Sequence, residues 1–336
     1  MKQIKGGVTA AKGYEAASTA AGIKYQGRTD MALIYSQVPC VSAGTFTTNV
    51  VKAAPVKWDR QIVDSGAGVQ AVIVNSGIAN ACTGEEGMGY CKETAEAAAK
   101  ALNIDAAGVL VGSTGVIGMH LPMQKLVDGI QVLAGKKAEG LQSGHDAALA
   151  IMTTDTVEKE MAVEIEIGGK TVTIGGMSKG SGMIHPNMCT MLAFITTDAA
   201  ITKEALQKAL SEDVEDTYNM ISVDGDTSTN DTAILLANGL AGNQEITYAS
   251  PEYETFKEAL HMVNETLAKK MAGDGEGATA LFEVKVVGAE SIKQAKTLAK
   301  SVVCSNLTKA AIAGHDANWG RILCAMGYSG VQFDPE

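Results

Sequence analysis

Residues 179–198 read KGSGMIHPNMCTMLAFITTD, and this stretch organises the fold and the chemistry that we expect of the chain. A flexible Gly-Ser-Gly turn and a bend at Pro186 precede Cys189-Thr190, and a continuous apolar run follows. The run predicts a buried strand or helix, so the hydroxyl of Thr190 would lie at the mouth of a buried segment. That position suits a nucleophile. It also suits a threonine whose hydroxyl simply bonds a backbone carbonyl where the segment begins.

A threonine hydroxyl is a weak nucleophile until a base accepts its proton. One known solution makes the threonine a new N-terminus, so that its own α-amino group, with a pKa of about 8, acts as the base. Cleavage between Cys189 and Thr190 would create this arrangement, and the Gly-Ser-Gly turn would supply a bendable loop for the cut. We assign His185 to the same cleavage loop. The thiol of Cys189 is the alternative nucleophile.

Composition limits the class of protein. The chain has 336 residues and a formal net charge of −11, with no cluster of Lys and Arg, so we expect no nucleic-acid partner. The six cysteines have no metal-site spacing, so we expect no metal. No uncharged apolar run reaches about 18 residues, and the N-terminus lacks the apolar core of a signal peptide. We therefore expect a cytoplasmic protein that does not associate with membranes.

Strand and helix patterns alternate along the chain and predict an α/β fold. Residues 69–77 form an apolar β-branched run, residues 84–103 an Ala-rich helix, and residues 108–118 a second strand that ends in a glycine-rich turn. A hairpin at 161–174, with its turn at Gly168-Gly169, leads to Lys179. The second half predicts helices at 202–220, 251–275, 291–303 and 317–327 and strands at 231–238 and 281–288.

The turn GSTGVIG, residues 112–118, could serve phosphate or acyl chemistry. It matches neither G-x-G-x-x-G nor a Walker A loop, because no Gly-Lys-Ser/Thr follows, so it predicts no nucleotide site. Two interpretations stay open for it. It is a plain strand-to-helix turn, or its Thr114 and Gly115 present donors to the oxyanion that forms during acyl transfer.

Seven segments, in order along the chain, resemble the glutamate N-acetyltransferase family, also called ornithine acetyltransferases. One of them is residues 179–192, which match the family's pattern of a Lys-Gly-Ser-Gly-Met turn followed by Pro-Asn-Met, one small residue and Thr-Met-Leu. The others are NSGIANACTG at 75–84, GSTGVIG at 112–118, IMTTDT at 151–156, SVDGDTSTNDT at 222–232, GDGEGAT at 273–279 and NWGRI at 318–322.

The resemblance implies a layered α/β sandwich of the ornithine acetyltransferase and self-processing aminopeptidase type. It implies self-cleavage into an α chain, residues 1–189, and a β chain, residues 190–336, with two copies of each in a heterotetramer. The implied activity belongs to arginine biosynthesis: the enzyme moves the acetyl group of N-acetylornithine to glutamate through an acetyl-threonine ester. No cofactor is implied, and the use of acetyl-CoA as a second acetyl donor is left open.

The resemblance also carries catalytic roles to three positions. Thr190 would be the nucleophile, and Thr114 and Gly115 would form the oxyanion hole. The family has merely a small residue at the position of Cys189, which makes a cysteine nucleophile the weaker alternative.

Three further positions would join Thr190 in binding substrate: Thr153, Lys179 and Glu276. Each has a plainer interpretation from sequence alone. Thr153 would cap a helix, Lys179 would be a solvated surface cation, and Glu276 would be a surface acid at a helix end. Thr154 is a neighbouring candidate for the role of Thr153.

Two other functions stay open. One is a self-cleaving amidohydrolase or aminopeptidase in which water resolves the acyl-enzyme, and product analysis with and without glutamate separates it from the transferase. The other is a non-catalytic α/β protein that is never cleaved and binds no amino acid. The family's C-terminal Asn and Ser/Thr, which help to bind substrate, have no counterpart, because the sequence stops at FDPE. We therefore expect a C-terminally short β chain.

Overall fold

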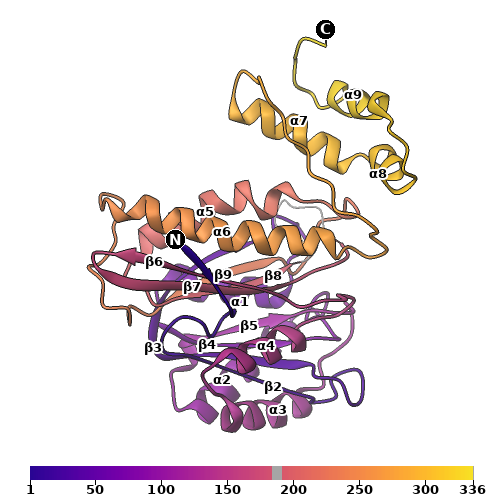
Figure 1. Ribbon diagram of the computed structural model, residues 1–336. Helices are drawn as coiled ribbons and strands as arrows, with labels where there is room; N and C mark the ends of the chain where they lie inside the picture. The colour runs from indigo at the N-terminus through magenta and orange to yellow at the C-terminus, as the bar shows by residue number, and fades with distance from the viewer. Residues whose placement is uncertain (184–190, 336) are drawn as a thin grey trace.

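A long strand, β3 (Met31–Phe46), folds the sheet of the molecule into two layers (Figure 1). Its first half pairs antiparallel with β2 (Tyr14–Thr19) and β4 (Val69–Asn75). After a register shift, its second half pairs antiparallel with β9 (Thr232–Ala237). One strand therefore belongs to both layers and connects them.

The computed structural model describes residues 1–183 and 191–335, and in these the strand order is β1-β6-β7-β8-β9-β3-β4-β5, with β2 beside β3. Two neighbouring pairs are parallel: β4 with β5 (Val109–Ser113), and β8 (Leu192–Thr197) with β9. The remaining strands, β1 (Lys2–Ile4), β6 (Lys159–Ile167) and β7 (Lys170–Lys179), pair antiparallel. Parallel pairing brings the carboxyl ends of β4 and β5 together at one edge, where the candidate site lies.

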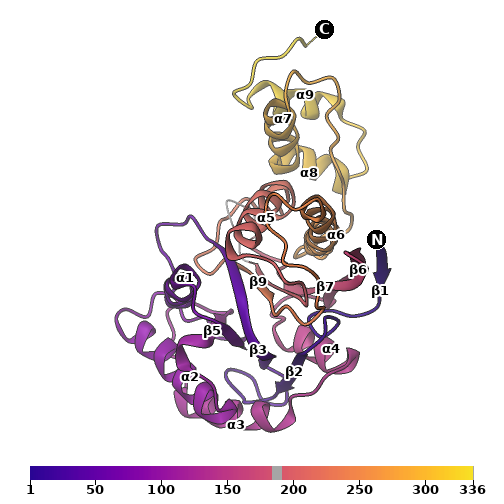
Figure 2. The same cartoon turned by 90° about the vertical axis from the view of Figure 1, so that its left-hand side faces the viewer.

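Helices cover the outer face of each layer (Figure 2). The layer of β6 to β9 lies under α5 (Lys203–Asp216) and α6 (Glu252–Gly273). The other layer lies under α2 (Glu86–Leu102) and α3 (Met123–Lys136). Two more helices, α1 (Ala54–Ser65) and α4 (Leu141–Ala150), add side chains to the core between the layers. The order is helix, sheet, sheet, helix, and it confirms the predicted layered α/β sandwich.

Burial on both faces explains the continuous apolar runs of the central strands. Along β4, Val72 and Val74 belong to the core between the sheets, whereas Ala71 and Ile73 belong to the core under α2 and α3. Since successive side chains point to opposite faces, a strand with two buried faces needs apolar residues at every position. The predicted strand at 69–77 is confirmed on this basis.

The predicted hairpin is also confirmed. β6 ends at Ile167 and β7 begins at Lys170, and the two turn residues, Gly168 and Gly169, have φ angles of 57° and 75°. Positive φ at both central residues is the geometry of a type I′ turn, which matches the twist of the flanking strands. β7 then carries Lys179 as its last residue.

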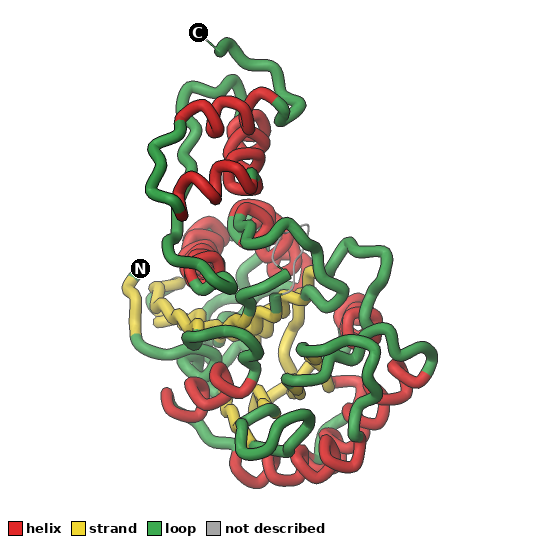
Figure 3. Tube along the Cα trace, turned by 90° about the vertical axis from the view of Figure 1, so that its right-hand side faces the viewer, coloured by secondary structure: helices red, strands yellow, loops and turns green. Residues whose placement is uncertain are grey.

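The C-terminal part forms a separate helical cluster beyond α6 (Figure 1), made of α7 (Ile292–Cys304), α8 (Asn306–Ala313) and α9 (Trp319–Gly327). The connection from α6 to α7 is loop throughout (Figure 3). The predicted strand at 281–288 is therefore wrong. Its residues alternate in exposure as a strand would, but a strand also requires a neighbouring edge to pair with, and α6 separates this segment from the sheet.

Within 1–183 and 191–335, no helix combines the length and the apolar character that crossing a membrane requires.

Candidate active site

A cavity of about 460 Å³ opens beyond the carboxyl ends of β4, β5 and β7. Several segments that are distant in sequence line it. The described residues for which the sequence predicts a role are among them: Thr114, Gly115, Thr153, its neighbouring candidate Thr154, Lys179 and Glu276. In α/β sheets, ligands bind outside the carboxyl ends of parallel strands, so the location fits a substrate site.

Gly115 follows β5 and lies against the turn after β4. Its φ is 132°, and a Cβ atom built on it would lie 2.3 Å from the carbonyl carbon of Gly77, so only glycine fits. The backbone N–H groups on either side are already hydrogen-bonded: Thr114 N–H donates to Asn75 O at 3.0 Å, and Val116 N–H donates to Gly77 O at 3.2 Å. The N–H of Gly115 has no hydrogen-bond partner in the described part of the chain. This turn therefore presents one uncommitted backbone donor.

Lys179 connects the two threonines of the site. It is only 3% exposed, and its Nζ donates to Thr114 Oγ1 at 3.3 Å and to Thr153 Oγ1 at 2.9 Å. Its ion-pair partner, Asp155 Oδ2, lies 3.9 Å away. An ammonium group can only donate, so both threonine hydroxyls accept from it and keep their own hydrogens for other acceptors. The interpretation of Lys179 as a solvated surface cation is wrong, because the sheet layer buries it.

The pKa of Lys179 lies below its ordinary value. Burial lowers it most, Asp155 raises it, and the neighbouring cation Lys159 lowers it again. Loss of water around an ammonium disfavours the charged form, and the ion pair only partly offsets this. The charged form of Lys179 is thus stabilised by its hydrogen bonds to Thr114 and Thr153 and by its ion pair with Asp155 rather than by water.

Glu276 reaches the cavity from the end of α6. Its N–H donates to Ser181 O at 2.7 Å. Its carboxylate lies so close to the backbone that a Cβ atom on Gly182 would be 2.6 Å from Oε1. The side chain is exposed, as expected for a helix-terminal acid, and it also lines the cavity. Both interpretations of Glu276 therefore describe the same placement.

Sequence reasoning missed the loop of residues 20–30, which lines another wall with Lys24 and Arg28. Asp30 holds this loop in shape by accepting two backbone N–H groups within it, at 2.6 and 2.7 Å. Arg28 Nη2 donates to the carbonyl oxygens of Met152 and Thr153 at 2.7 and 2.9 Å. AAGIKYQGRTD looks like an ordinary polar loop, and only the fold brings it to the cavity.

The charges that line the cavity have both signs. Lys24, Arg28 and Lys179 are cationic, whereas Asp30 and Glu276 are acidic. Because Asp30 is used within its loop, Glu276 is the carboxylate open to a ligand. A ligand that carries both a carboxylate and an ammonium group, such as an amino acid, matches this lining.

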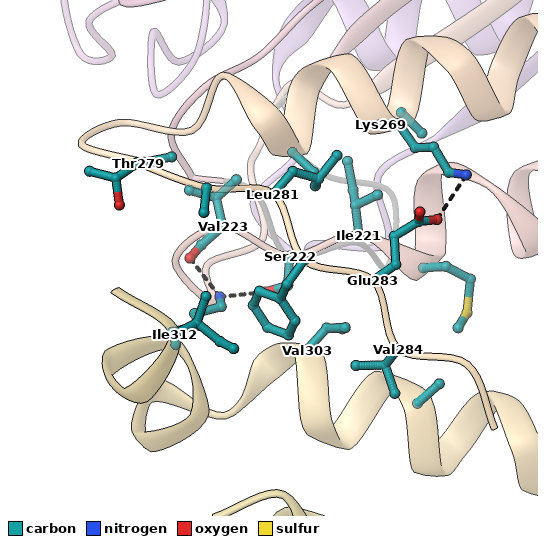
Figure 4. A pocket seen from close by; sticks show the side chains of 18 of the residues that line it. Ile221, Ser222, Val223, Lys269, Thr279, Leu281, Glu283, Val284, Val303 and Ile312 are labelled. Atoms are coloured by element: carbon teal, nitrogen blue, oxygen red, sulfur yellow. Dashed lines mark hydrogen bonds and ion pairs between the residues drawn. The ribbon is translucent and has the colours of Figure 1, made fainter. Parts of the chain in front are cut away.

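A second cavity, of about 360 Å³, lies between α6, the loop that follows it and the C-terminal helices (Figure 4). Its walls are largely aliphatic, with the labelled side chains of Ile221, Leu281 and Ile312 pointing into it (Figure 4). It shares Glu276 with the first cavity and holds no other described residue with a predicted catalytic or binding role. The first cavity is therefore the candidate active site.

The predicted nucleophile Thr190, the cleavage partner Cys189 and the loop residue His185 lie outside the described residues. The chain on either side of them is described. Met183 lines the first cavity, and the N–H of Met191 donates to Asp231 Oδ1 at 3.1 Å. The second described stretch thus starts at a buried carboxyl group, whose pKa burial raises well above its usual range.

Comparison with known proteins identifies related sequences along nearly the whole chain. Residues 15–336 match the family model described as "ArgJ family". A protein of Symbiobacterium thermophilum named "Arginine biosynthesis bifunctional protein ArgJ" is 55% identical over 337 residues, which cover 100% of this chain and 83% of that protein.

Solved structures share the fold. One titled arginine biosynthesis bifunctional protein argJ, from Bacillus halodurans, has a TM-score of 0.53 at 44% identity, and the match covers 55% of this chain and 96% of that chain. A β-aminopeptidase of Burkholderia has a TM-score of 0.51 at 12% identity, and the match covers 99% of this chain and 96% of that chain. The second similarity concerns the fold alone.

Proposed function

The chain belongs to the ArgJ family, and on this premise we propose that it is an acetyltransferase of arginine biosynthesis, which moves the acetyl group of N-acetylornithine to glutamate. One observation carries the assignment to this cavity: Thr114, Gly115, Thr153, Lys179 and Glu276 come from four separate segments and line the same space. The groups that we propose for oxyanion stabilisation and for amino-acid binding thus line one cavity.

The reaction has two halves that share one nucleophile. The hydroxyl oxygen of Thr190 attacks the acetyl carbonyl of N-acetylornithine, and the α-amino group of Thr190 accepts the hydroxyl proton. The amide C–N bond breaks, the proton passes to the leaving amine, and ornithine departs from an acetyl-threonine ester. The amine of glutamate then attacks the ester, its proton returns through the same amino group to the threonine oxygen, and N-acetylglutamate leaves.

The contacts at the turn after β5 favour two particular donors for the oxyanion. The backbone N–H of Thr114 is used by Asn75, so it contributes the hydroxyl instead, which keeps its hydrogen because Lys179 donates to its oxygen. The second donor is the N–H of Gly115. Each such donor contributes about 3 kcal/mol to transition-state stabilisation in other acyl-transfer sites.

The charges of the lining suggest how the substrate is oriented. We assign the substrate carboxylate to the cationic side chains of Arg28 and Lys179, and the side-chain ammonium group of N-acetylornithine to Glu276. Replacement of Glu276 by Gln should therefore raise KM for N-acetylornithine more than KM for glutamate, which has no ammonium group on its side chain.

We also propose cleavage between Cys189 and Thr190 into chains of residues 1–189 and 190–336, assembled two and two in the cytoplasm. The match to the solved relative from Bacillus halodurans supports the cleavage, since it spans 96% of that chain but 55% of this one. This is close to the share that 189 residues take in a chain of 336. A relative whose two parts form separate chains would give such a match.

Acetyl-CoA is a second acetyl donor in our proposal, because the relative from Symbiobacterium thermophilum is named a bifunctional protein. No further cofactor is needed, since the nucleophile, the base and the oxyanion donors all belong to the chain. Release of free coenzyme A thiol from acetyl-CoA in the presence of glutamate tests this second donor.

The experiment that tests the proposed function follows the fate of the acetyl group. Purified protein is incubated with N-acetylornithine, with and without glutamate, and the products are separated by mass spectrometry beside a Thr190→Ala control. N-acetylglutamate and ornithine that form only when glutamate is present support the transferase. Acetate that forms equally without glutamate would instead identify a hydrolase, and unchanged substrate would exclude both.

A further inference from the structure

Three segments that are far apart in sequence meet behind the first cavity, and each contributes to its lining. Residues 153–157 follow α4 and supply Thr153, residues 179–182 begin with Lys179, the last residue of β7, and residues 274–276 follow α6 and end with Glu276. Lys179 pairs with Leu192 of β8 in the sheet, but the rest of these segments lie in turns, which have no regular hydrogen-bonding pattern of their own that would fix their relative positions. Another set of contacts must hold the three together.

Lys159, the first residue of β6, lies at the junction of these segments and is fully buried. Its Nζ donates to Asp155 Oδ1 at 2.8 Å, to Asp274 Oδ2 at 2.6 Å and to Val157 O at 3.1 Å. An ammonium group has three hydrogens, so all its donors are used. We call Asp155, Lys159 and Asp274 the ion cluster.

Asp155 connects the ion cluster to two of the segments. Its Oδ1 also accepts the N–H of Gly180 at 2.7 Å, and its Oδ2 accepts the N–H of Thr153 at 3.0 Å. The same Oδ2 lies 3.9 Å from Lys179 Nζ. One buried carboxylate thus holds the backbone of Thr153 and the turn that begins at Lys179.

Asp274 connects the ion cluster to the third segment. It is the C-cap residue of α6 and lies two positions before Glu276. Its carboxylate accepts the N–H groups of Thr156 at 3.0 Å and of Val157 at 3.4 Å, and it also accepts the hydroxyl of Thr156. The end of α6 is therefore bonded to residues 156–157. The backbone hydrogen bond from Glu276 N–H to Ser181 O connects the same segment to residues 179–182.

Charged hydrogen bonds differ from apolar contacts in what they fix. Apolar packing holds segments together but tolerates small sliding, whereas a buried ammonium with three fixed acceptors determines directions as well as distances. No member of the ion cluster lines the cavity itself. A role in binding or in chemistry would require contact with the ligand, so the position of the ion cluster suits an indirect role.

We propose that the ion cluster is the positioning device of the active site, which sets Thr153, Lys179 and Glu276 relative to one another. The inference rests on the proposed function, because positioning matters only if those side chains act on one substrate. It adds Lys159 as a positioning residue with no substrate contact of its own. A displacement of even about 1 Å at such a site can reduce the rate on the order of 100-fold.

The test compares two Lys→Met variants of the full-length protein. Lys159→Met removes the ammonium of the ion cluster. Lys137→Met removes the ammonium that pairs with Glu15 at 2.5 Å, an ion pair whose side chains are only 25% and 14% exposed and which touches no cavity residue. Both are examined for folding by circular dichroism and for acetyl transfer to glutamate per mole of folded, cleaved protein.

We expect Lys159→Met to lower kcat/KM on the order of 10- to 100-fold, and Lys137→Met to stay within about twofold of wild type. A folded Lys159→Met protein with wild-type kcat and KM would overturn the proposal, because it would leave the ion cluster a purely stabilising role. If Lys159→Met does not fold, Asp274→Asn keeps the side-chain shape, removes one charge and is judged by the same criterion.

Amide hydrogen exchange separates this inference from the proposed function, since it needs no substrate. In Lys159→Met we expect faster exchange in all three segments, at 153–157, 179–182 and 274–276, and no change there in Lys137→Met. Faster exchange confined to the neighbourhood of the substitution would overturn the positioning role. If wild-type protein transferred no acetyl group, the proposed function would fail, and the exchange pattern would still decide whether the ion cluster orders the site.

Discussion

The first and second cavities are built in opposite ways. The first is walled by turns that buried charges and committed backbone groups hold in place, such as the ion cluster and the close approach of Gly115 to Gly77. The second is walled largely by aliphatic side chains, and the ion pair beside it, Lys269 with Glu283, has side chains that are 42% and 67% exposed. Acyl transfer needs hydrogen-bond donors that are fixed in position and orientation, which fits the first cavity, whereas the packing of a helical cluster needs no such donors.

Equivalent substitutions at the first and second cavities should therefore have unequal effects on the rate of acetyl transfer. Changes at the first cavity should reduce the rate of acetyl transfer in protein that is still folded. Changes at the second should alter stability slightly and leave the rate alone.

Gly115→Ala should have the largest effect. A Cβ atom at this position would lie 2.3 to 2.7 Å from three backbone atoms of residues 77–78, and its φ of 132° is unfavourable for alanine, so the turn must move. We expect kcat/KM for acetyl transfer to fall about 100-fold or more. Gly327→Ala, at the end of α9 where nothing lies within 4 Å of the added atom, is the matched control and should be neutral. Equal activities of the two variants would remove the distinction.

Thr114→Val should have the next largest effect, because it keeps the shape of the side chain and removes the hydroxyl donor. The loss of one oxyanion donor predicts a fall in kcat of about 100-fold, with KM little changed. Thr114→Ser retains the hydroxyl and should keep most of the activity. Steady-state kinetics with both substrates measure this, and a Thr114→Val enzyme as fast as wild type would exclude the hydroxyl from the oxyanion hole.

Acid should lower the free energy of unfolding by protonating Asp155 and Asp274, the carboxylates behind the first cavity. Burial alone would raise the pKa of Asp155, but the cations Lys179 and Lys159 lower it by more. Burial would also raise the pKa of Asp274, but Lys159 and the hydrogen bonds from Thr156 lower it by more. Both pKa values therefore lie below the ordinary range. Unfolded aspartate titrates near a pKa of about 3.9. The stabilisation is therefore fully present above about pH 5 and is lost as pH falls through the folded pKa values.

Urea unfolding at pH 7 and in acid measures this loss. Asp274→Asn should lower the free energy of unfolding at pH 7, and its dependence on pH should be shallower than that of wild type. Identical pH dependence in the two proteins would show that Asp274 carries no such linkage.

Lys269→Ala, beside the second cavity, should have the smallest effect. The ion pair with Glu283 is 2.8 Å long but largely exposed, and exposed pairs contribute about 0 to 1 kcal/mol. We expect a change in Tm of at most a few degrees and unchanged acetyl transfer. A loss of activity as large as that of Thr114→Val would mean that the second cavity takes part in the reaction.

Sequence reasoning reached the residues of the first cavity through local motifs. Thr114, Gly115, Thr153, Lys179 and Glu276 each lie in a short segment that resembles the family, and the structure brings all five together. The α/β class and the hairpin followed from continuous apolar strands and a clear glycine turn between β6 and β7, whereas the layered sandwich was implied by the resemblance to the family. These features depend on local chemistry, which a sequence displays directly.

What the sequence concealed depends on long-range pairing. Lys159 looks like one more charge before an alternating strand, and its burial follows from Asp274, which is 115 positions away. Arg28 reaches Met152 across a similar gap. The wrong strand at 281–288 has the same cause, since alternation indicates which side chains face inward but not whether a partner strand is present.

The proposed reaction requires that Thr190 become an N-terminal nucleophile, and the intact mass under denaturing conditions shows whether it does. Freshly purified protein is measured beside Thr190→Ala. We predict two fragments that meet between Cys189 and Thr190, absent from the variant. A single uncut chain in both samples, or a cut at another bond, would contradict the mechanism, whatever the cavity binds.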